Sequence, residues 1–99
     1  MTLDLHFICK HQENWKKISA SVFETGDWTI SDKKAQEASI GGRIYLHEKQ
    51  NDPAWHGGTI KSWGLSKTKG RKFFRYEVDG PFRVKCADNW SQESAFVPR

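Results

Sequence analysis

The sequence predicts a small α+β domain, a mixed β-barrel with short helices packed at its ends. This prediction rests on residues 28–60. They contain, in order, a Trp-x-x-Ser start, a short polar helix and two strands, each of which follows a Gly-Gly turn. The 99 residues are 36% apolar and 13% aromatic. A chain of this length suits one domain, residues 1–99, whose thin core depends on a few large rings.

The first element is predicted to be a strand. Residues 3–10 alternate in polarity, as a half-buried strand does. The expected buried face consists of Leu3, Leu5, Phe7 and Cys9.

A helix is predicted next, over residues 11–23. Trp15, Ile18 and Val22 recur there at the spacing of one helical stripe. The turn signal at residues 25–27, Thr-Gly-Asp, is expected to end this helix.

The following segment predicts a short strand, a helix and another strand. Residues 27–31 form the short strand, and Ser31 has the side chain and the position of a helix N-cap. The helix is expected over residues 32–38, before the turn at Gly41 and Gly42. The strand after that turn, residues 43–49, places Ile44 and Leu46 on one face. Its other face consists of Arg43, Tyr45 and His47.

The remaining strands follow turn signals. After a loop at residues 50–53, Gly57 and Gly58 are predicted to form the turn that starts a strand over residues 59–63. Residues 73–78 and 82–86 alternate in polarity and are joined by a turn at residues 79–81. Residues 94–97 are predicted to add a last short strand that closes the sheet.

Charge is unevenly distributed over a net +4. Residues 1–58 hold seven basic and eight acidic residues, whereas residues 59–99 hold nine and four. The interval from Gly57 to Tyr76 contains only basic charges, interleaved with aromatic rings. Such a block is typical of a face that binds phosphates, but it equally suits a lysine-rich hairpin loop that keeps the chain soluble and blocks edge pairing.

Several classes of protein are not indicated. The sequence has no apolar run of about 18 residues and no signal-peptide pattern at its start, so we expect a cytoplasmic protein with Cys9 and Cys86 reduced. The four histidines form no zinc-protease pair, and neither a C-x₂₋₄-C knuckle nor a glycine-rich phosphate loop occurs. We therefore expect no catalytic residue, no metal and no cofactor.

Four features resemble the PUA-like superfamily, and within it the EVE and YTH-like branch. They are the start at residues 28–31, the helix that follows, the strand at residues 42–46 and the strand at residues 57–60. The likeness covers roughly residues 3–85 in the order of elements, although Arg43 stands where the family commonly has aspartate. The resemblance implies a barrel with a pocket that accepts a nucleobase, often a modified one, from DNA or RNA.

The residues expected at this base pocket are Trp28, Ser31, Tyr45, Trp55 and Gly57. The tryptophans would be stacking walls, Tyr45 a wall or a phenolic donor, and Ser31 with the backbone near Gly57 the partners of the base edge. Each has a structural alternative: Trp28 suits the core, and Ser31 suits a helix cap.

The residues expected to bind the nucleic-acid backbone are Lys61, Trp63, Lys67, Lys69, Arg71, Lys72 and Arg75. Trp63 equally suits a ring that covers the barrel end, and Trp90 is expected to pack the C-terminal segment down. The predicted function is a non-enzymatic module that recognises a modified or flipped base. Two alternatives remain: a protein-interaction module that grips a peptide or a methylated amine in an aromatic cage, and a small hydrolase or nuclease.

Overall fold

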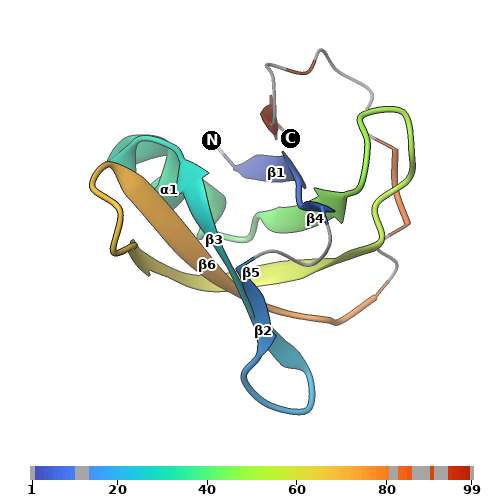
Figure 1. Ribbon diagram of the computed structural model, residues 1–99, viewed down its shortest axis with the longest axis horizontal. Helices are drawn as coiled ribbons and strands as arrows, with labels where there is room; N and C mark the ends of the chain where they lie inside the picture. Colours follow the sequence, from blue (N-terminus) through green and yellow to red (C-terminus); the bar gives the residue numbers. More distant parts are fainter. Residues whose placement is uncertain (1, 11–13, 81–82, 86–89, 91–93, 99) are drawn as a thin grey trace.

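One sheet of seven strands makes up most of the described chain, and a single helix packs on it (Figure 1). The computed structural model describes residues 2–10, 14–80, 83–85, 90 and 94–98. The strands are β1 (Leu3–Ile8), β2 (Trp15–Lys17), β3 (Val22–Thr29), β4 (Arg43–His47), β5 (His56–Leu65), β6 (Arg71–Glu77) and β7 (Ser94–Pro98). The helix α1 spans Asp32–Ala38. The described chain is mostly β, and its one helix is compatible with the predicted α+β class.

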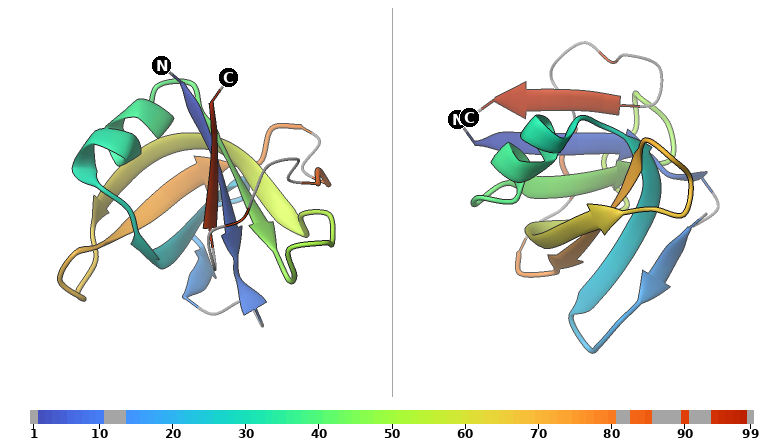
Figure 2. Two further views of the ribbon diagram at one scale, coloured as in Figure 1. Left: turned by 90° about the horizontal axis from the view of Figure 1, so that it is seen from above. Right: turned by 90° about the vertical axis from the view of Figure 1, so that its left-hand side faces the viewer.

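The sheet is mixed and curved, but in the described part of the chain it is not closed into a barrel. Its order is β2-β3-β6-β5-β4-β1-β7, so β2 and β7 are its two edges. β1 and β4 run parallel, and the other neighbouring strands are antiparallel. The two views of Figure 2 show the sheet curling, and the start of β1 lying beside the end of β7, where Leu3 pairs with Pro98. The predicted last strand is present as β7, but it extends the edge beside β1 and does not close the sheet.

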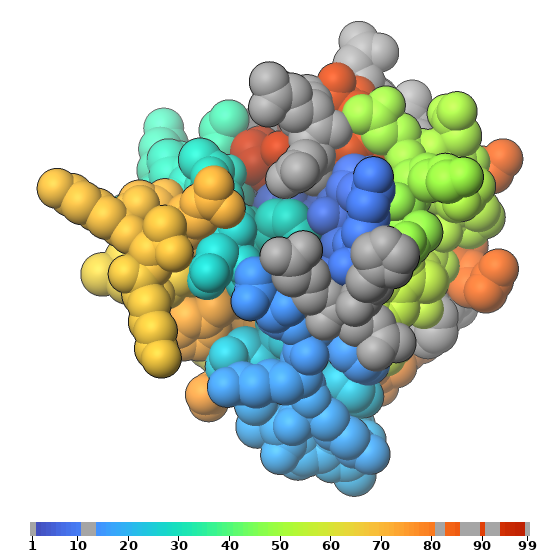
Figure 3. Space-filling model, viewed as in Figure 1, coloured from blue at the N-terminus to red at the C-terminus, as the bar shows by residue number. Residues whose placement is uncertain are grey.

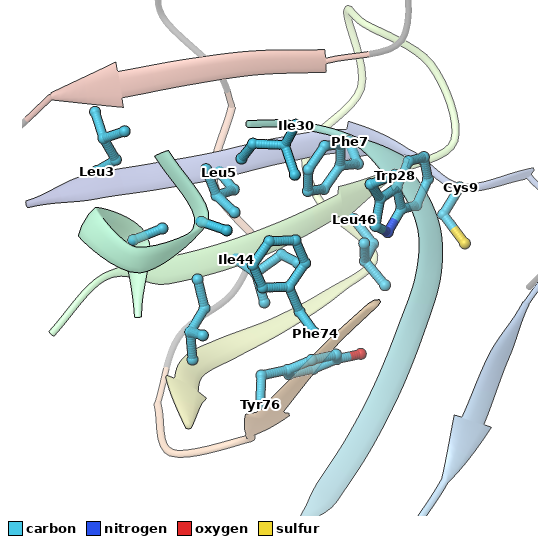
Figure 4. Close-up of a cluster of buried hydrophobic side chains, with 13 residues drawn as sticks. Leu3, Leu5, Phe7, Cys9, Trp28, Ile30, Ile44, Leu46, Phe74 and Tyr76 are labelled. Carbon is cyan, nitrogen blue, oxygen red and sulfur yellow. The ribbon is translucent and has the colours of Figure 1, made fainter. Parts of the chain in front are cut away.

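The inner side of the curled sheet holds the hydrophobic core (Figure 4). Leu3, Leu5 and Phe7 of β1 lie in it with Cys9, which follows β1, as the predicted buried face requires, and Ile44 and Leu46 of β4 lie there too. The ring of Phe7 stacks on that of Trp28 with centroids 4.3 Å apart. Full burial of side chains of this size contributes about 1.5–3 kcal/mol each.

The predicted helix over residues 11–23 is wrong. In its described part the chain forms β2, a turn and the start of β3, with Trp15 paired to Thr25. A helical stripe would bury Ile18, which is 42% exposed, whereas the hairpin stacks Trp15 on Phe23 with centroids 5.1 Å apart. Pairing with β6, which lies far along the sequence, overrides the local period.

The predicted turn at residues 25–27 is instead a bulge within β3. Pairing between β3 and β6 shifts register between Thr25 and Trp28. Gly26 and Asp27 therefore stand outside the ladder with β6, while the strand continues to Thr29.

The predicted helix over residues 32–38 is confirmed, with its cap. The Ser31 hydroxyl accepts a hydrogen bond from the Lys34 amide at 3.2 Å. The ammonium of Lys72 anchors the start of α1 to β6, since it lies 3.1 Å from the Asp32 carboxylate and 3.1 Å from the Ile30 carbonyl oxygen.

Gly58 has a different role from the predicted turn. Gly57 and Gly58 lie inside β5, where a Cβ on Gly58 would come 2.1 Å from the carbonyl oxygen of Glu77. Glycine is thus required there for close approach of two backbones.

The expected strand over residues 82–86 is not found in its described part, since residues 83–85 lie outside the sheet. Its two end residues lie outside the described residues.

The reverse face of β1 and β4 buries a pair of histidines. His47 Nδ1 lies 2.8 Å from the Asp52 carbonyl oxygen, which only accepts, so His47 donates there. Its Nε2, 2.8 Å from His6 Nδ1, then accepts a hydrogen bond from His6. Tyr45 stacks on His6, and Trp90 packs edge-on against both histidines, in line with the packing role expected for it.

Burial keeps both histidines neutral. It lowers the pKa of His6 to about 4 from an ordinary value of 6.5, and the neighbouring His47 adds to this effect. Burial likewise lowers the pKa of His47.

Acidification is therefore expected to destabilise the fold through His6. In the unfolded chain the His6 ring is protonated below about pH 6.5, whereas in the folded chain it is protonated only below about pH 4. The contribution of His6 to the free energy of unfolding is therefore complete above about pH 6.5, decreases between about pH 6.5 and 4, and does not change further below about pH 4. The loss is on the order of 3 kcal/mol. It can be measured as the free energy of urea unfolding across this range, with an NMR titration of the His6 ring.

The control is His6→Gln, because the glutamine amide donates to His47 and does not titrate. This variant should show a shallower decline of stability with acid. A His6 pKa near 6.5, or an unchanged decline in the variant, would contradict the prediction.

Candidate functional site

The structure places two of the predicted pocket residues in structural roles. Trp28 is 8% exposed, stacks on Phe7 and donates a hydrogen bond from Nε1 to the Thr25 hydroxyl at 3.1 Å. Ser31 is exposed and caps α1. Both positions match the structural alternatives that the sequence left open.

The other three pocket residues lie on different parts of the sheet. Tyr45 and Gly57 are brought together, because they are paired between β4 and β5. Tyr45 stacks on His6 on the reverse face, and its hydroxyl accepts from Arg43 Nε at 3.1 Å. Trp55 is half-buried and donates from Nε1 to the Cys9 carbonyl oxygen at 3.1 Å.

A cleft of about 530 Å³ lies elsewhere, between the β2–β3 hairpin and the β5–β6 turn. In Figure 3 these two segments, blue and gold, project from the body of the molecule as separate lobes. None of the five predicted pocket residues lines the cleft. Its lining consists of Asn14, Trp15, Lys16, Glu24, Gly26, Asp27, Leu65, Ser66, Lys67 and Phe73.

Phe73 supplies an apolar surface of the cleft, and two glycines determine its place. A Cβ on Gly64 would lie 2.5 Å from Cε2 and Cζ of Phe73, so the ring covers Gly64. A Cβ on Gly26 would lie 3.3 Å from the Phe73 Cβ. Gly64 thus leaves room for the ring, and Gly26 for the start of the same side chain.

Trp15 forms a second apolar wall, held by a buried hydrogen-bond relay. Its Nε1 donates to the Tyr76 hydroxyl at 2.7 Å. That hydroxyl also shares a hydrogen bond with His56 Nδ1 at 2.7 Å, in which the tautomer of His56 decides which group donates. Burial lowers the pKa of His56 and raises that of Tyr76, which keeps the relay neutral.

Two polar side chains in the cleft lack partners among the described residues. The Ser66 hydroxyl oxygen is buried and makes no hydrogen bond. The Asp27 carboxylate has no ion pair in the same part of the chain, although its main-chain carbonyl accepts from Arg71 at 3.3 Å. Glu24, by contrast, is neutralised by Arg75 at 2.9 Å and Lys16 at 3.4 Å.

The residues expected to bind a nucleic-acid backbone divide into two groups. Lys67, Lys69 and Arg71 are exposed at the β5–β6 turn and form no ion pair with a described acidic residue. The other three cations are engaged, Lys61 with Glu77, Arg75 with Glu24 and Lys72 with Asp32.

Lys72 is buried, and Trp63 is partly buried and held by contacts within the fold. Lys72 is only 4% exposed, so its charge is not free for phosphate. Trp63 is packed against the core, and its Nε1 donates to Gln36 Oε1 at 3.2 Å. That contact matches the alternative in which Trp63 covers one end of the sheet.

Sequence reasoning did not find Trp15, Asp27 or Ser66 as cleft residues. Trp15 was assigned to a helix, and Asp27 to a turn that ends it. One sequence signal for these residues is the Gly26-Asp27 pair inside a β-rich segment. Such a pair is compatible with a β-bulge, whose residues lie outside the regular strand pairing.

Other site types find no support in the described residues. No group of three or more His, Cys, Asp or Glu side chains among them is placed to hold a metal ion. The helix that the structure describes has seven residues and is too short to cross a membrane. No family model, curated protein or solved structure matches this chain.

Proposed function

We propose that the chain is a non-enzymatic nucleic-acid-binding module, a PUA-like mixed barrel in type, that holds an unstacked base in the cleft. The phosphate backbone runs along the β5–β6 turn. One observation carries the proposal: three exposed cations without described ion-pair partners stand beside a cleft with aromatic walls. The resemblance of residues 28–60 to the PUA-like superfamily supports the same function.

The size and the walls of the cleft suit a base. Its volume of about 530 Å³ falls in the range of roughly 300–1,000 Å³ found for small-molecule sites. Stacking on an aromatic ring stabilises a bound base by about 1–3 kcal/mol. Extruding a base from a duplex costs a few kcal/mol, so single strands, or modified bases that pair weakly, bind better than plain duplex.

The exposed cations supply affinity without sequence preference. Each phosphate contact on a single strand contributes about −0.7 to the slope of log K against log salt concentration. Lys67, Lys69 and Arg71 together account for a slope of about −2.

A second candidate function is the aromatic cage for a methylated amine or a peptide. The Asp27 carboxylate, which no described cation pairs with, lines the cleft together with Trp15 and Phe73 and favours the cage, because rings and a carboxylate both attract a cation. Lys16 and Lys67, which also line the cleft, repel such a ligand, and for this reason we favour nucleic acid.

The triple variant Lys67→Ala, Lys69→Ala and Arg71→Ala should weaken binding to every oligonucleotide and flatten the salt slope by about 2. Fluorescence anisotropy with labelled single- and double-stranded 12-mers of mixed sequence, at several salt concentrations, measures both quantities. The matched control removes three exposed lysines outside the cleft, Lys10, Lys33 and Lys49. If both triple variants lose the same affinity and the same salt slope, the loss comes from the lower net charge of the protein and not from the β5–β6 turn. Tight binding of a methyllysine peptide without oligonucleotide binding would favour the cage.

Phe73→Ala should lower affinity for single strands by about 5- to 150-fold, because the stacking surface is lost, while the salt slope stays unchanged. Gly64→Ala should act in the same direction, since its methyl group displaces the Phe73 ring. Phe73→Trp is the control that keeps an aromatic surface and should retain binding. Full affinity in Phe73→Ala, with folding verified by circular dichroism, would remove Phe73 from the site.

A further inference from the structure

Two hydrogen-bonding side chains that line the cleft, Ser66 and Asp27, have no partner among the described residues. A buried hydroxyl without a partner costs about 1–3 kcal/mol, and most such groups in proteins are satisfied. The Ser66 hydroxyl is unsatisfied in the described part of the chain. It lies close to the bulge, 3.7 Å from the position that a Cβ on Gly26 would occupy. Ser66 and Asp27 both line the cleft, and they belong to two different elements, the β5–β6 turn and the bulge of β3.

The bulge is fixed from both sides, so that Asp27 is held in place. The Gly26 amide donates to the Asn14 carbonyl oxygen at 3.1 Å, and Arg71 donates to the main-chain carbonyl of Asp27 at 3.3 Å. These contacts use only main-chain atoms of the bulge. Within the part of the chain that the structure describes, the Asp27 carboxylate has no ion pair, so it is available to a ligand.

A carboxylate only accepts hydrogen bonds, and this determines which base edges it tolerates. Amino groups on cytosine, adenine and guanine donate to it. The carbonyl oxygens of uracil and thymine only accept hydrogen bonds, so the carboxylate repels them. The Ser66 hydroxyl either donates or accepts, and it can therefore complete the contact with a ring nitrogen beside the amino group.

We propose, on the basis of the proposed function above, that Asp27 makes the cleft selective for bases that carry an exocyclic amino group, with Ser66 as the second edge partner. The selected ligand class is single-stranded nucleic acid rich in cytosine, adenine or guanine, and uracil and thymine are disfavoured. Cytosine and uracil test this directly, because they have the same ring size and differ in an amino group against a carbonyl.

The experiment compares binding of 12-mer oligonucleotides of deoxycytidine and of deoxyuridine at about pH 8, where cytosine is neutral. The wild-type protein should bind the cytosine strand about 5- to 150-fold more tightly, the range for one well-placed pair of contacts. Asp27→Asn should reduce this ratio to below about threefold, because the amide also donates to the uracil carbonyl. Ser66→Ala should weaken cytosine binding while a preference for cytosine persists.

The outcomes separate this inference from the proposed function. If the wild-type protein binds both strands equally and keeps its salt slope, the module binds nucleic acid but Asp27 does not select bases. If Asp27→Asn keeps the full cytosine preference, the selectivity comes from another residue. Failure to bind either strand defeats the proposed function and this inference together. The affinity ratio is insensitive to the added net charge of the variant, which acts on both strands alike.

Discussion

The stack of Phe7 on Trp28 is the contact on which the shape of the domain depends. Phe7 belongs to β1 and Trp28 to β3, and three strands, β6, β5 and β4, separate them in the sheet order. Their rings nevertheless meet with centroids 4.3 Å apart, so the sheet must curl back on itself to bring them together. Phe74 of β6 fills the space between, 6.2 Å from the Phe7 ring. Burial of these large rings is what offsets the entropy of ordering so short a chain.

The same contact determines where the cleft lies. Because the Trp28 ring points into the core, the register of β3 has to shift between Thr25 and Trp28. The shift frees Gly26 and Asp27 from pairing with β6 and places them in the lining of the cleft beside the β5–β6 turn. Phe73, on the opposite face of β6 from Phe74, then occupies the space that Gly26 and Gly64 leave. A packing requirement in the core thus creates a ligand-sized hollow on the other side of the sheet.

Polar groups are treated differently in the two aromatic regions outside the main core. On the reverse face of β1 and β4, His6 and His47 satisfy each other and the Asp52 carbonyl, and they require the neutral state. In the cleft, Ser66 and Asp27 are unsatisfied among the described residues, and cations stand nearby. Trp90 Nε1, which packs against these histidines, is likewise buried without a described partner, so the cations and the aromatic walls beside Ser66 and Asp27 are what distinguish the cleft as a candidate binding site.

The sequence by itself determined the features that depend on near neighbours. The alternation of Leu3, Leu5 and Phe7, and the side chain of Ser31 ahead of a polar helix, sufficed to predict β1 and α1, because side-chain period and capping are local effects. Tertiary structure decided the features that depend on distant partners. It paired Trp15 with β3 in a hairpin, placed Trp28 in the core and buried Lys72 beneath α1. The site differed from its prediction for the same reason: a cleft is formed by strands that are far apart along the chain, and no local pattern records which side chains their pairing brings together.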